Sequence, residues 1–388
     1  VAAAGAWTGA PGRSPLEGIA LVTDPAGAEV AWIPAALLAE SEVRDALARV
    51  APTEGRHLAA HGAKALLRSL TDLGVDAGLG VDTMLAAYLL DPAESRYLLE
   101  ELLIRYAQLQ LPEQSATAEG QLDLDDSATS PSVMAAREAL AVDRLVGPLQ
   151  ASLEANGVQA LFDDIEVPLV GVLARMEAVG IAVDRAVLEG THQQLVTECD
   201  TLSAHTAQIV EDAGEEFNVN STKQMREILF DKLGLTPQKK TKTGYSTDAA
   251  SLEKLLGQHP IIEHLLRYRE VEKLRGTYGE GLLAEIAPDG RIHATFNQTV
   301  ARTGRLSSDA PNLHNIPVRR EAGKECRTAF VPAPGFEMLV ADYNQIELRC
   351  IAHLAEDPGL FVAYAAAREI HTETASRIFG VEPEAVSG

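Results

Sequence analysis

The segment from Glu337 to Ala355 places an acidic residue where an apolar strand meets an amphipathic helix. Glu337–Ala341 is an apolar run typical of a strand, and the apolar residues from Gln345 to Ala355 follow helical spacing. This pattern predicts Asp342 at the end of a strand, where a rigid element holds its carboxylate over a cleft. A carboxylate on an apolar strand is costly unless it is paired or binds a metal, and Glu347 supplies a second acid soon afterwards. The alternative is an exposed aspartate that caps the following helix.

Charge is distributed unevenly along the chain. The 388 residues carry a formal net charge of −23, which by itself argues against nucleic acid as a partner. Residues 1–165 hold 10 basic and 24 acidic side chains, whereas residues 218–330 hold 18 basic and 13 acidic ones. An acidic body with one basic segment is typical of a protein that binds a polyanion along one face. A solvated surface of ion pairs is the alternative, but it does not explain why the basic residues cluster.

The length and composition predict two or three globular domains. The chain is 46% hydrophobic and 23% charged, as ordinary globular proteins are. It has no apolar run long enough to span a bilayer and no basic N-terminus followed by a hydrophobic stretch, so we expect a cytoplasmic protein with no membrane partner. Cys199, Cys326 and Cys350 lie far apart and predict neither a disulfide nor a metal site.

Two motifs carry a resemblance to a known family. Asp342–Arg349 reads DYNQIELR, and Thr303–Pro317 contains TGRLSS followed by PNLHNIP. Both resemble motifs of the family A DNA polymerases, the bacterial DNA polymerase I group, and they come in that family's order and at about its spacing. Asn344 stands where the family usually has Ser, and His314 stands where it has Gln.

The resemblance implies an α/β plus α+β protein in three parts. Residues 1–165 resemble the RNase H-like 3′-5′ exonuclease-type domain that precedes the polymerase, here in degenerate form. Residues 166–290 resemble a helical connector and thumb. Residues 291–388 resemble a partial palm that contains the first catalytic motif.

Local patterns predict elements within these parts. We expect a hairpin of strands at residues 18–23 and 29–33, a strand at 291–296, a loop at 113–131, and helices near 41–50, 62–73, 82–90, 184–215, 261–283 and 369–379. The leucines of the 184–215 helix recur every seven residues, which in isolation would indicate a coiled-coil seam.

The carboxylates that an active nuclease of this family needs are mostly missing. The resemblance implies an Asp-x-Glu pair on the first strand, but the strand that we take as the first, Gly18–Val22, has no acid. The region of His61–Lys64 lacks one too, and Glu138 is the one acid near a matching position. One carboxylate cannot hold two metals, so we expect a structural domain without nuclease activity. Asp82 resembles a residue of the fold and not a metal ligand.

Basic and polar residues between 218 and 330 are candidates for contacts with primer-template DNA. Gln238–Thr247 is expected to be a flexible basic tip that tracks phosphates without reading sequence, and a capping box of Ser221 and Gln224 leaves Lys223 beside a helix terminus that can hold a phosphate. Arg305 lies in a glycine-containing turn from which a guanidinium can reach minor-groove acceptors. A solvated loop and a purely structural cap are the alternatives. With the resemblance, the expected DNA-binding set is Lys223, Lys239, Lys240, Lys242, Lys273, Arg275, Arg305, His314 and Asn315.

The resemblance also implies a reaction. A primer 3′-hydroxyl attacks the α-phosphate of a deoxynucleoside triphosphate, and two Mg²⁺ ions, for which Mn²⁺ can substitute, stabilise the attacking and leaving oxygens. Asp342 is then the catalytic ligand shared by both metals, and the Tyr343 carbonyl is a further metal ligand. Glu347 packs against the sugar and disfavours a 2′-hydroxyl. The implied nucleotide-binding set is Tyr343, Gln345, Glu347, Arg319 and His371, although a water-facing residue at a helix start explains His371 equally well.

The expected partners are primer-template DNA and deoxynucleoside triphosphates, and the expected role is replication or repair synthesis by a nucleoid-associated monomer. The family's fingers helix and second catalytic Asp are not found in the 388 residues. We therefore expect a C-terminal polymerase segment to come from a longer chain or a second chain, and this chain alone to bind primer-template without extending it. A non-catalytic module that binds primer-template DNA is the alternative, and a proofreading nuclease is disfavoured by the missing carboxylates.

Overall fold

The computed structural model describes residues 1–54, 57–110, 130–211, 218–241, 244–316, 321–366, 369–382 and 385–386. It separates into two compact units, Val1–Ala333 and Pro334–Gly388. The first unit contains two hydrophobic cores, one built from residues between Ala2 and Ala174 and one from residues between Leu188 and Ala329. We call the parts around these cores the N-terminal lobe (residues 1–179) and the helical lobe (residues 180–333). None of the described helices is both long and apolar enough to cross a membrane.

The N-terminal lobe is built on a mixed sheet. β1 (Ala3–Trp7), β2 (Leu16–Asp24) and β3 (Glu29–Pro34) are antiparallel, whereas β4 (Leu58–Ala60) and β5 (Leu79–Asp82) are parallel. A parallel bridge between Ala2 and Ala59 joins the two groups, which gives the strand order β3-β2-β1-β4-β5. The predicted hairpin is confirmed, but the strand that contains Gly18–Val22 is the second of the lobe and not the first. The first was missed because its alanine-rich sequence lacks the β-branched residues that signal a strand.

Helices cover this sheet. They are α1 (Ala35–Leu38), α2 (Ser41–Val50), α3 (Lys64–Asp72), α4 (Thr83–Leu90), α5 (Leu99–Leu102), the π-helical turn η1 (Leu103–Ala107) and α6 (Pro131–Ala155). The helices predicted near 41–50, 62–73 and 82–90 are confirmed as α2, α3 and α4, and the predicted loop at 113–131 lies almost wholly outside the described residues.

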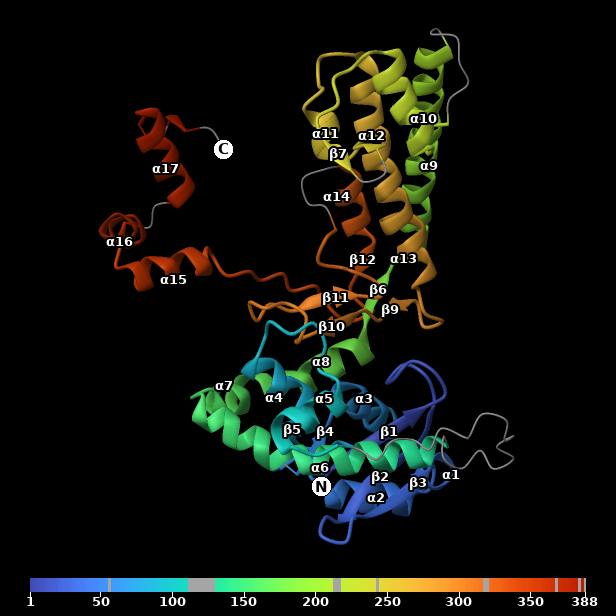
Figure 1. Cartoon of the computed structure of the whole chain (residues 1–388), viewed down its shortest axis with the longest axis vertical. Coiled ribbons are helices and arrows are strands. Elements are labelled where there is room, and N and C mark those ends of the chain that lie inside the picture. Colours follow the sequence, from blue (N-terminus) through green and yellow to red (C-terminus); the bar gives the residue numbers. More distant parts are fainter. Residues whose placement is uncertain are drawn as a thin grey trace. The chain divides into compact units, whose positions relative to one another are not determined.

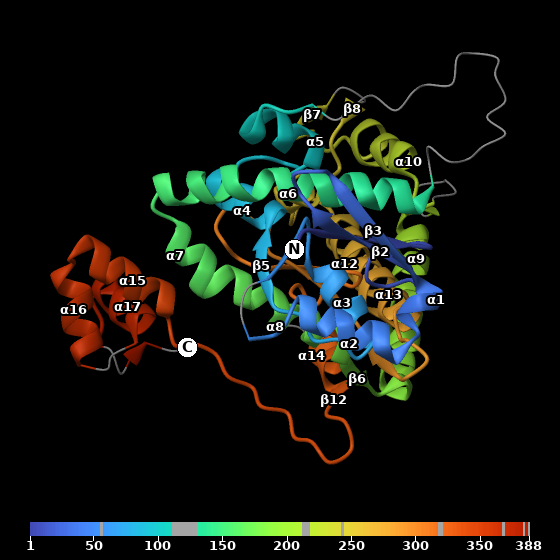
Figure 2. The same cartoon turned by 90° about the horizontal axis from the view of Figure 1, so that it is seen from below.

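The long helix α6 crosses the sheet and packs on β1 and β2 (Figures 1 and 2). Ala135, Ala139 and Val142 lie at helical spacing on its buried face, and the strands beneath present Ala4 and Ala20. Small side chains on both surfaces let the backbones approach closely, so the alanine-rich composition of this lobe is a packing requirement.

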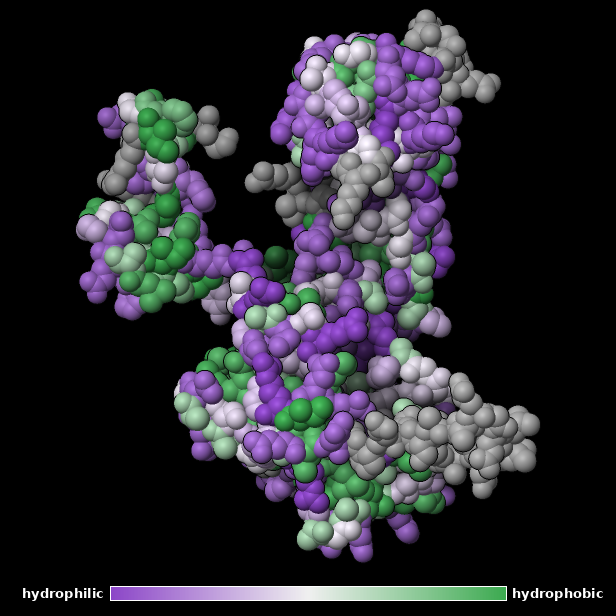
Figure 3. Space-filling model, viewed as in Figure 1, coloured by the Kyte–Doolittle hydropathy of each residue, from purple (hydrophilic) through white to green (hydrophobic). Residues whose placement is uncertain are grey.

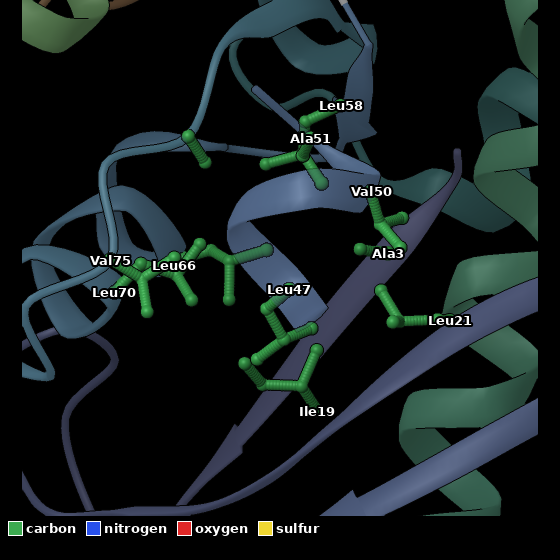
Figure 4. Close-up of a pocket in the computed structure, with 11 residues that line it drawn as sticks. Ala3, Ile19, Leu21, Leu47, Val50, Ala51, Leu58, Leu66, Leu70 and Val75 are labelled. Carbon is green, nitrogen blue, oxygen red and sulfur yellow. The ribbon is translucent and has the colours of Figure 1, made fainter. Parts of the chain in front are cut away.

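A cavity of about 20 Å³ lies inside the N-terminal lobe between the sheet and helices α2 and α3. Figure 4 shows aliphatic side chains pointing into it, among them Ile19, Leu47, Leu66 and Leu70. Its volume is about that of one water probe, and its apolar lining offers a water no hydrogen-bond partners. It is a packing void of the core and not a ligand site.

The helical lobe follows a connector made of α7 (Gln159–Leu161), η3 (Phe162–Glu166) and α8 (Val167–Val179). Its main helices are α9 (Arg185–Glu211) and α12 (Pro260–Leu274), which lie side by side in Figure 1, and the shorter elements are α10 (Thr222–Arg226), η4 (Glu227–Lys232), α11 (Ala249–Glu253), η5 (Arg275–Glu280), α13 (Gly281–Ala284) and α14 (Glu321–Thr328). The leucines that recur every seven residues in α9 lie on the side that faces α12. Leu188 and Leu195 are buried together with Ile261 and Leu265 of α12. The predicted long helices at 184–215 and 261–283 are therefore confirmed over most of their length. The leucine seam joins two helices of the same lobe.

Short strands stabilise the base of the helical lobe. β6 (Ile181–Val183), β9 (Arg291–Ile292) and β12 (Phe330–Val331) form one sheet, and β10 (Thr295–Asn297) pairs with β11 (Ser307–Asp309). The continuous strand predicted at 291–296 is wrong, because the chain breaks at His293 and Ala294. The His293 ring is held by the Glu177 carbonyl at 2.8 Å and by Asp289 at 3.1 Å, which turns the backbone away from a regular strand.

The second unit contains α15 (Ile346–Ala355), α16 (Pro358–Ala365) and α17 (Ile370–Phe379), which confirms the helices predicted around 345–355 and 369–379. Figure 3 shows hydrophobic residues gathered on the visible surface of this unit. Leu354 is 82% exposed and Phe379 is 75% exposed. Such a surface is more apolar than the surface of most monomeric domains.

Candidate functional site

The basic tip at Gln238–Thr247 contains two short paired strands where the structure describes it. Strands β7 (Lys240–Thr241) and β8 (Gly244–Tyr245) pair antiparallel, and Lys242 lies outside the described residues. The sequence did not predict this short ladder, and the flexibility of the tip stays a prediction. Lys239 and Lys240 remain exposed, and the Lys239 Nζ lies 3.5 Å from a carboxylate oxygen of Asp248.

Lys223 lies in the first turn of α10, beside the helix N-terminus. The Ser221 hydroxyl accepts a hydrogen bond from the Gln224 N–H at 3.3 Å, so the first arm of the predicted capping box is confirmed. The second arm is wrong: the Gln224 side chain accepts from the Asn218 N–H at 3.0 Å, because the Ser221 N–H already donates to the Asn218 carbonyl. The Lys223 side chain is exposed to solvent.

Lys273 and Arg275, predicted together as DNA contacts, lie in different electrostatic surroundings. Lys273 is exposed near the end of α12. Arg275 donates to Glu272 at 2.7 and 2.8 Å and to Glu280 at 2.5 Å. Hydrogen bonds donated to Glu272, then the charges of Glu272 and Glu280, raise the pKa of the Arg275 guanidinium. Lys273 therefore offers its charge to solvent, whereas that of Arg275 is compensated within the protein.

A polar cavity of about 300 Å³ adjoins this arginine between α9 and α12. Its lining residues are Val196, Cys199, Asp200, Ser203, Asn220, Tyr268, Glu272 and Arg275. Burial, and then the hydrogen bond to Glu272, raise the pKa of the Cys199 thiol to about 12, so this cysteine stays protonated and unreactive at neutral pH.

Arg305, His314 and Asn315 belong to the loops that flank β11. Gly304 has φ +78°, a conformation that favours glycine, and it forms the turn that exposes Arg305. His314 is exposed, with its ring 5.8 Å from that of Phe296 on β10. The main chain of exposed Asn315 accepts a hydrogen bond from Tyr278 Oη. The structure thus presents all three predicted side chains on the surface of one lobe.

Asp342 lies in the second unit on an extended segment without strand pairing. The strand predicted at Glu337–Ala341 is wrong, because no described residue pairs with its backbone and a strand needs such a partner. Leu339 and Val340 are 89% and 86% exposed, although their apolar character is that of a buried strand. The carboxylates of Asp342 and Glu347 are both exposed, as is the Tyr343 ring at 80%.

A small cluster fixes the junction that follows Asp342. Gln345 has φ +52° immediately before α15, and its side-chain oxygen lies 3.4 Å from Tyr364 Oη of α16. The Arg349 guanidinium stacks 4.4 Å from the centre of the Tyr364 ring, and its Nε donates to the Asn344 carbonyl at 3.0 Å. Sequence reasoning missed Arg349 and Tyr364, although Arg349 stands inside the quoted motif.

Of the two remaining candidates for nucleotide binding, the structure describes one. His371 is exposed in the first turn of α17, and Arg319 lies outside the described residues. Within the described ranges no three His, Cys, Asp or Glu side chains are grouped so as to hold a metal ion. Asp342 and the Tyr343 carbonyl are hard oxygen donors, the type that Mg²⁺ prefers, so the residues present fit part of such a site.

The contacts of Asp82, a carboxylate of the N-terminal lobe, are those of a structural residue. Buried Asp82 accepts hydrogen bonds from the N–H groups of Gly62, Ala63, Met84 and Leu85 at 2.7 to 3.2 Å. The true first strand, β1, also carries no acid. Burial alone raises the pKa of Glu138 to about 7.

The family model described as DNA polymerase family A matches residues 185–388. DNA polymerase I of Mycobacterium tuberculosis is 41% identical over 336 residues, which are 85% of this chain and 37% of that protein. DNA polymerase I of Geobacillus stearothermophilus is 44% identical over 314 residues, which are 80% of this chain and 35% of that protein.

One solved structure resembles the fold throughout. It is the POL domain of Pol1 from M. smegmatis in complex with DNA primer-template and dNTP, with a TM-score of 0.84 and 34% identity. The match covers 100% of this chain and 65% of that one. This chain spans between about a third and two fifths of the length of the curated relatives named above. The motifs, the family model and the fold agree, and the chain belongs to DNA polymerase family A.

Proposed function

We propose that this chain is the part of a DNA-directed DNA polymerase that binds primer-template DNA and supplies the first catalytic carboxylate. The observation that carries the proposal is the likeness of the whole chain to a POL domain solved with primer-template and dNTP. Arg305, His314 and Asn315 are exposed on one lobe, and Lys223, Lys239, Lys240 and Lys273 are exposed on the same lobe. We propose that these residues contact the DNA, with Lys242 and Arg275 as further members of the set.

The reaction proposed is transfer of a nucleotide to a primer 3′-hydroxyl during replication or repair synthesis. Divalent cations, Mg²⁺ or Mn²⁺, supply charge stabilisation when bound. Asp342 and the Tyr343 carbonyl would hold them as oxygen ligands. Glu347 lies in the first turn of α15, where its side chain can limit the space at the sugar, and Gln345, His371 and Arg319 complete the nucleotide-binding set. The ring of Tyr364 beneath Arg349 keeps the start of α15 in place.

The division into an exonuclease-type domain at 1–165, a connector and thumb at 166–290 and a partial palm at 291–388 belongs to the same proposal. So does the loss of nuclease activity. Its support is the acid-free strand β1 and the engagement of Asp82 with four backbone amides, which gives this carboxylate a structural role in the fold.

Salt dependence of primer-template binding tests the DNA-contact set. Non-specific affinity arises mainly from phosphate neutralisation, and the slope of log K against log salt falls by about 0.9 for each lost duplex contact. We expect that replacing Lys239, Lys240 and Lys242 by Ala flattens the slope, as measured by fluorescence anisotropy of a labelled primer-template.

The matched control removes Arg49, Arg96 and Arg105, three exposed arginines of the N-terminal lobe. It changes the net charge equally and should leave the slope close to that of the wild type. Equal slopes for the lysine variant and the wild type would refute the assignment of the tip to DNA.

A further inference from the structure

The carboxylate of Glu177 on α8 is one of the few buried charges of the molecule. Its residue is 2% exposed, and its two oxygens lie 2.6 Å from Lys64 Nζ and 3.0 Å from Arg68 Nη1, both on α3. Burying a carboxylate is expensive unless hydrogen-bonded cations compensate it. The three charges are therefore held at this place by each other, and removal of the Glu177 charge leaves both cations uncompensated.

The same ion pair binds the backbone of Phe296, which lies on β10 in the helical lobe. Glu177 Oε1 accepts a hydrogen bond from the Phe296 N–H at 2.8 Å, and Lys64 Nζ donates to the Phe296 carbonyl. In an antiparallel ladder both main-chain groups of one residue point to the same side. Glu177 and Lys64 thus satisfy the edge of β10 that faces away from β11, as a neighbouring strand would.

Other side chains of the N-terminal lobe hold the chain on both sides of Phe296. Arg13 donates to the His293 carbonyl at 2.6 Å, Gln298 donates to Glu166 at 2.8 Å, and Tyr88 Oη donates to the Ala301 carbonyl at 2.7 Å. Residues 293–301 are therefore bound to the N-terminal lobe along their whole length, immediately before the turn that contains Arg305.

Contacts then run from Phe296 to the proposed DNA-binding loop. Phe296 pairs with Ser308 across the ladder, and Ser308 is 3% exposed. The Ser308 hydroxyl donates to the Pro311 carbonyl at 3.1 Å and accepts from the Leu313 N–H at 3.3 Å. The Phe296 ring itself lies 5.8 Å from the ring of His314. The position of Phe296 thus bears directly on Ser308 and His314, and Arg305 lies three residues before Ser308 on the same loop.

We propose that Glu177 is a positioning residue for primer-template binding: with Lys64 it clamps β10 to the N-terminal lobe and so sets the placement of Arg305 and His314. The proposal rests on the proposed function for the role of these two residues. It assigns the N-terminal lobe a part in DNA binding that needs no nuclease chemistry and no DNA contact of its own.

The test compares Glu177→Gln with the wild type in two measurements. The amide retains an acceptor for the Phe296 N–H but leaves Lys64 and Arg68 without their counter-charge. We expect primer-template affinity to fall by about two- to thirtyfold, the range of coupling between linked sites. We also expect the imidazole resonance of His314 in the DNA-free protein, assigned with His314→Gln, to move because its distance from the Phe296 ring changes.

Two further variants make the test specific. Tyr88→Phe removes only the Tyr88 hydroxyl, which bonds the backbone at Ala301 and at Gly304. If Glu177→Gln does not fold, this variant decides the question: we expect a smaller shift of the His314 resonance in the same direction. Arg105→Gln breaks an exposed ion pair of the N-terminal lobe and should change neither affinity nor resonance.

The proposal is overturned if the His314 resonance keeps its wild-type position in the folded variants, or if it moves while the affinity stays the same. Absence of binding by the wild type would instead refute the proposed function, and the resonance would still show whether Glu177 positions the loop.

Discussion

Replacement of Asp82 by Ala should destabilise the N-terminal lobe strongly, because this carboxylate organises two helix starts at once. Its oxygens accept from Gly62 and Ala63 before α3 and from Met84 and Leu85 in the first turn of α4. Asp82 is 4% exposed, so solvent cannot replace these bonds fully. Loss of an N-cap costs about 1 kcal/mol, and each further buried N–H left without an acceptor costs about 1 to 3 kcal/mol. We expect the free energy of unfolding to fall by about 3 to 7 kcal/mol.

The free energy of unfolding of Asp82→Asn should lie between that of the wild type and that of Asp82→Ala. Its oxygen can keep the three bonds now made by Oδ1, but its NH₂ group would face the Ala63 N–H, which is now 2.7 Å from Oδ2. We expect a loss of about 1 to 3 kcal/mol from this one conflict. The exposed acid Asp76 provides the control, since Asp76→Ala should stay within about 0.5 kcal/mol of the wild type.

Urea unfolding followed by tryptophan fluorescence measures these losses in the N-terminal lobe, which contains Asp82. The chain has 2 tryptophans, Trp7 on β1 and Trp32 on β3, and both report on the N-terminal lobe. A loss below about 1 kcal/mol for Asp82→Ala would refute the reasoning. Stabilisation of the wild type by Mg²⁺ that disappears in Asp82→Ala would show instead that Asp82 is a metal ligand.

Two further predictions concern ionisation and catalysis. Burial raises the pKa of Glu138 from 4.5 to about 7, so as pH rises the unfolded state releases this proton before the folded state does. The free energy of unfolding should therefore fall by up to about 3 kcal/mol between about pH 4.5 and pH 7 and then level off. Glu138→Gln should remove this part of the pH dependence in urea titrations, and an unchanged profile would mean that the carboxyl group is hydrated. The 388-residue chain should bind a labelled primer-template without adding a nucleotide in Mg²⁺ or Mn²⁺, because one aspartate and a carbonyl offset too little of the repulsion between two cations. Extension that is lost in Asp342→Ala would contradict this prediction.

Local patterns predicted the regular elements well, because each reports on its own neighbourhood. The hairpin of β2 and β3, the helices α2 to α4 and the N-cap at Ser221 follow from spacing and capping residues alone. The segment Glu337–Ala341 shows the limit of this reasoning: its composition indicates burial, but strand formation depends on a partner that no local pattern specifies. Strand β1 was missed for the opposite reason, since alanines become a strand there only through packing beneath α6.

The sequence predicted candidate site residues only where they belong to a motif. Asp342, Arg305 and His314 could be proposed because they stand in recognisable stretches. The clamp of Glu177, Lys64 and Phe296 joins residues more than one hundred positions apart in sequence, and each has an ordinary local context. The compensation of Arg275 by Glu280 depends on the π-helical turn η5, which brings two residues five positions apart together.

Hydrogen–deuterium exchange with and without primer-template DNA tests the central claim most directly, because it locates the DNA on the chain. The account predicts slower exchange at residues 218–241, where the basic tip begins, and at residues 303–316, with the surface of the N-terminal lobe around α2 unchanged. Protection confined to the N-terminal lobe, or no protection while the DNA is bound, would contradict the claim that the helical lobe and its β10–β11 hairpin bind the primer-template.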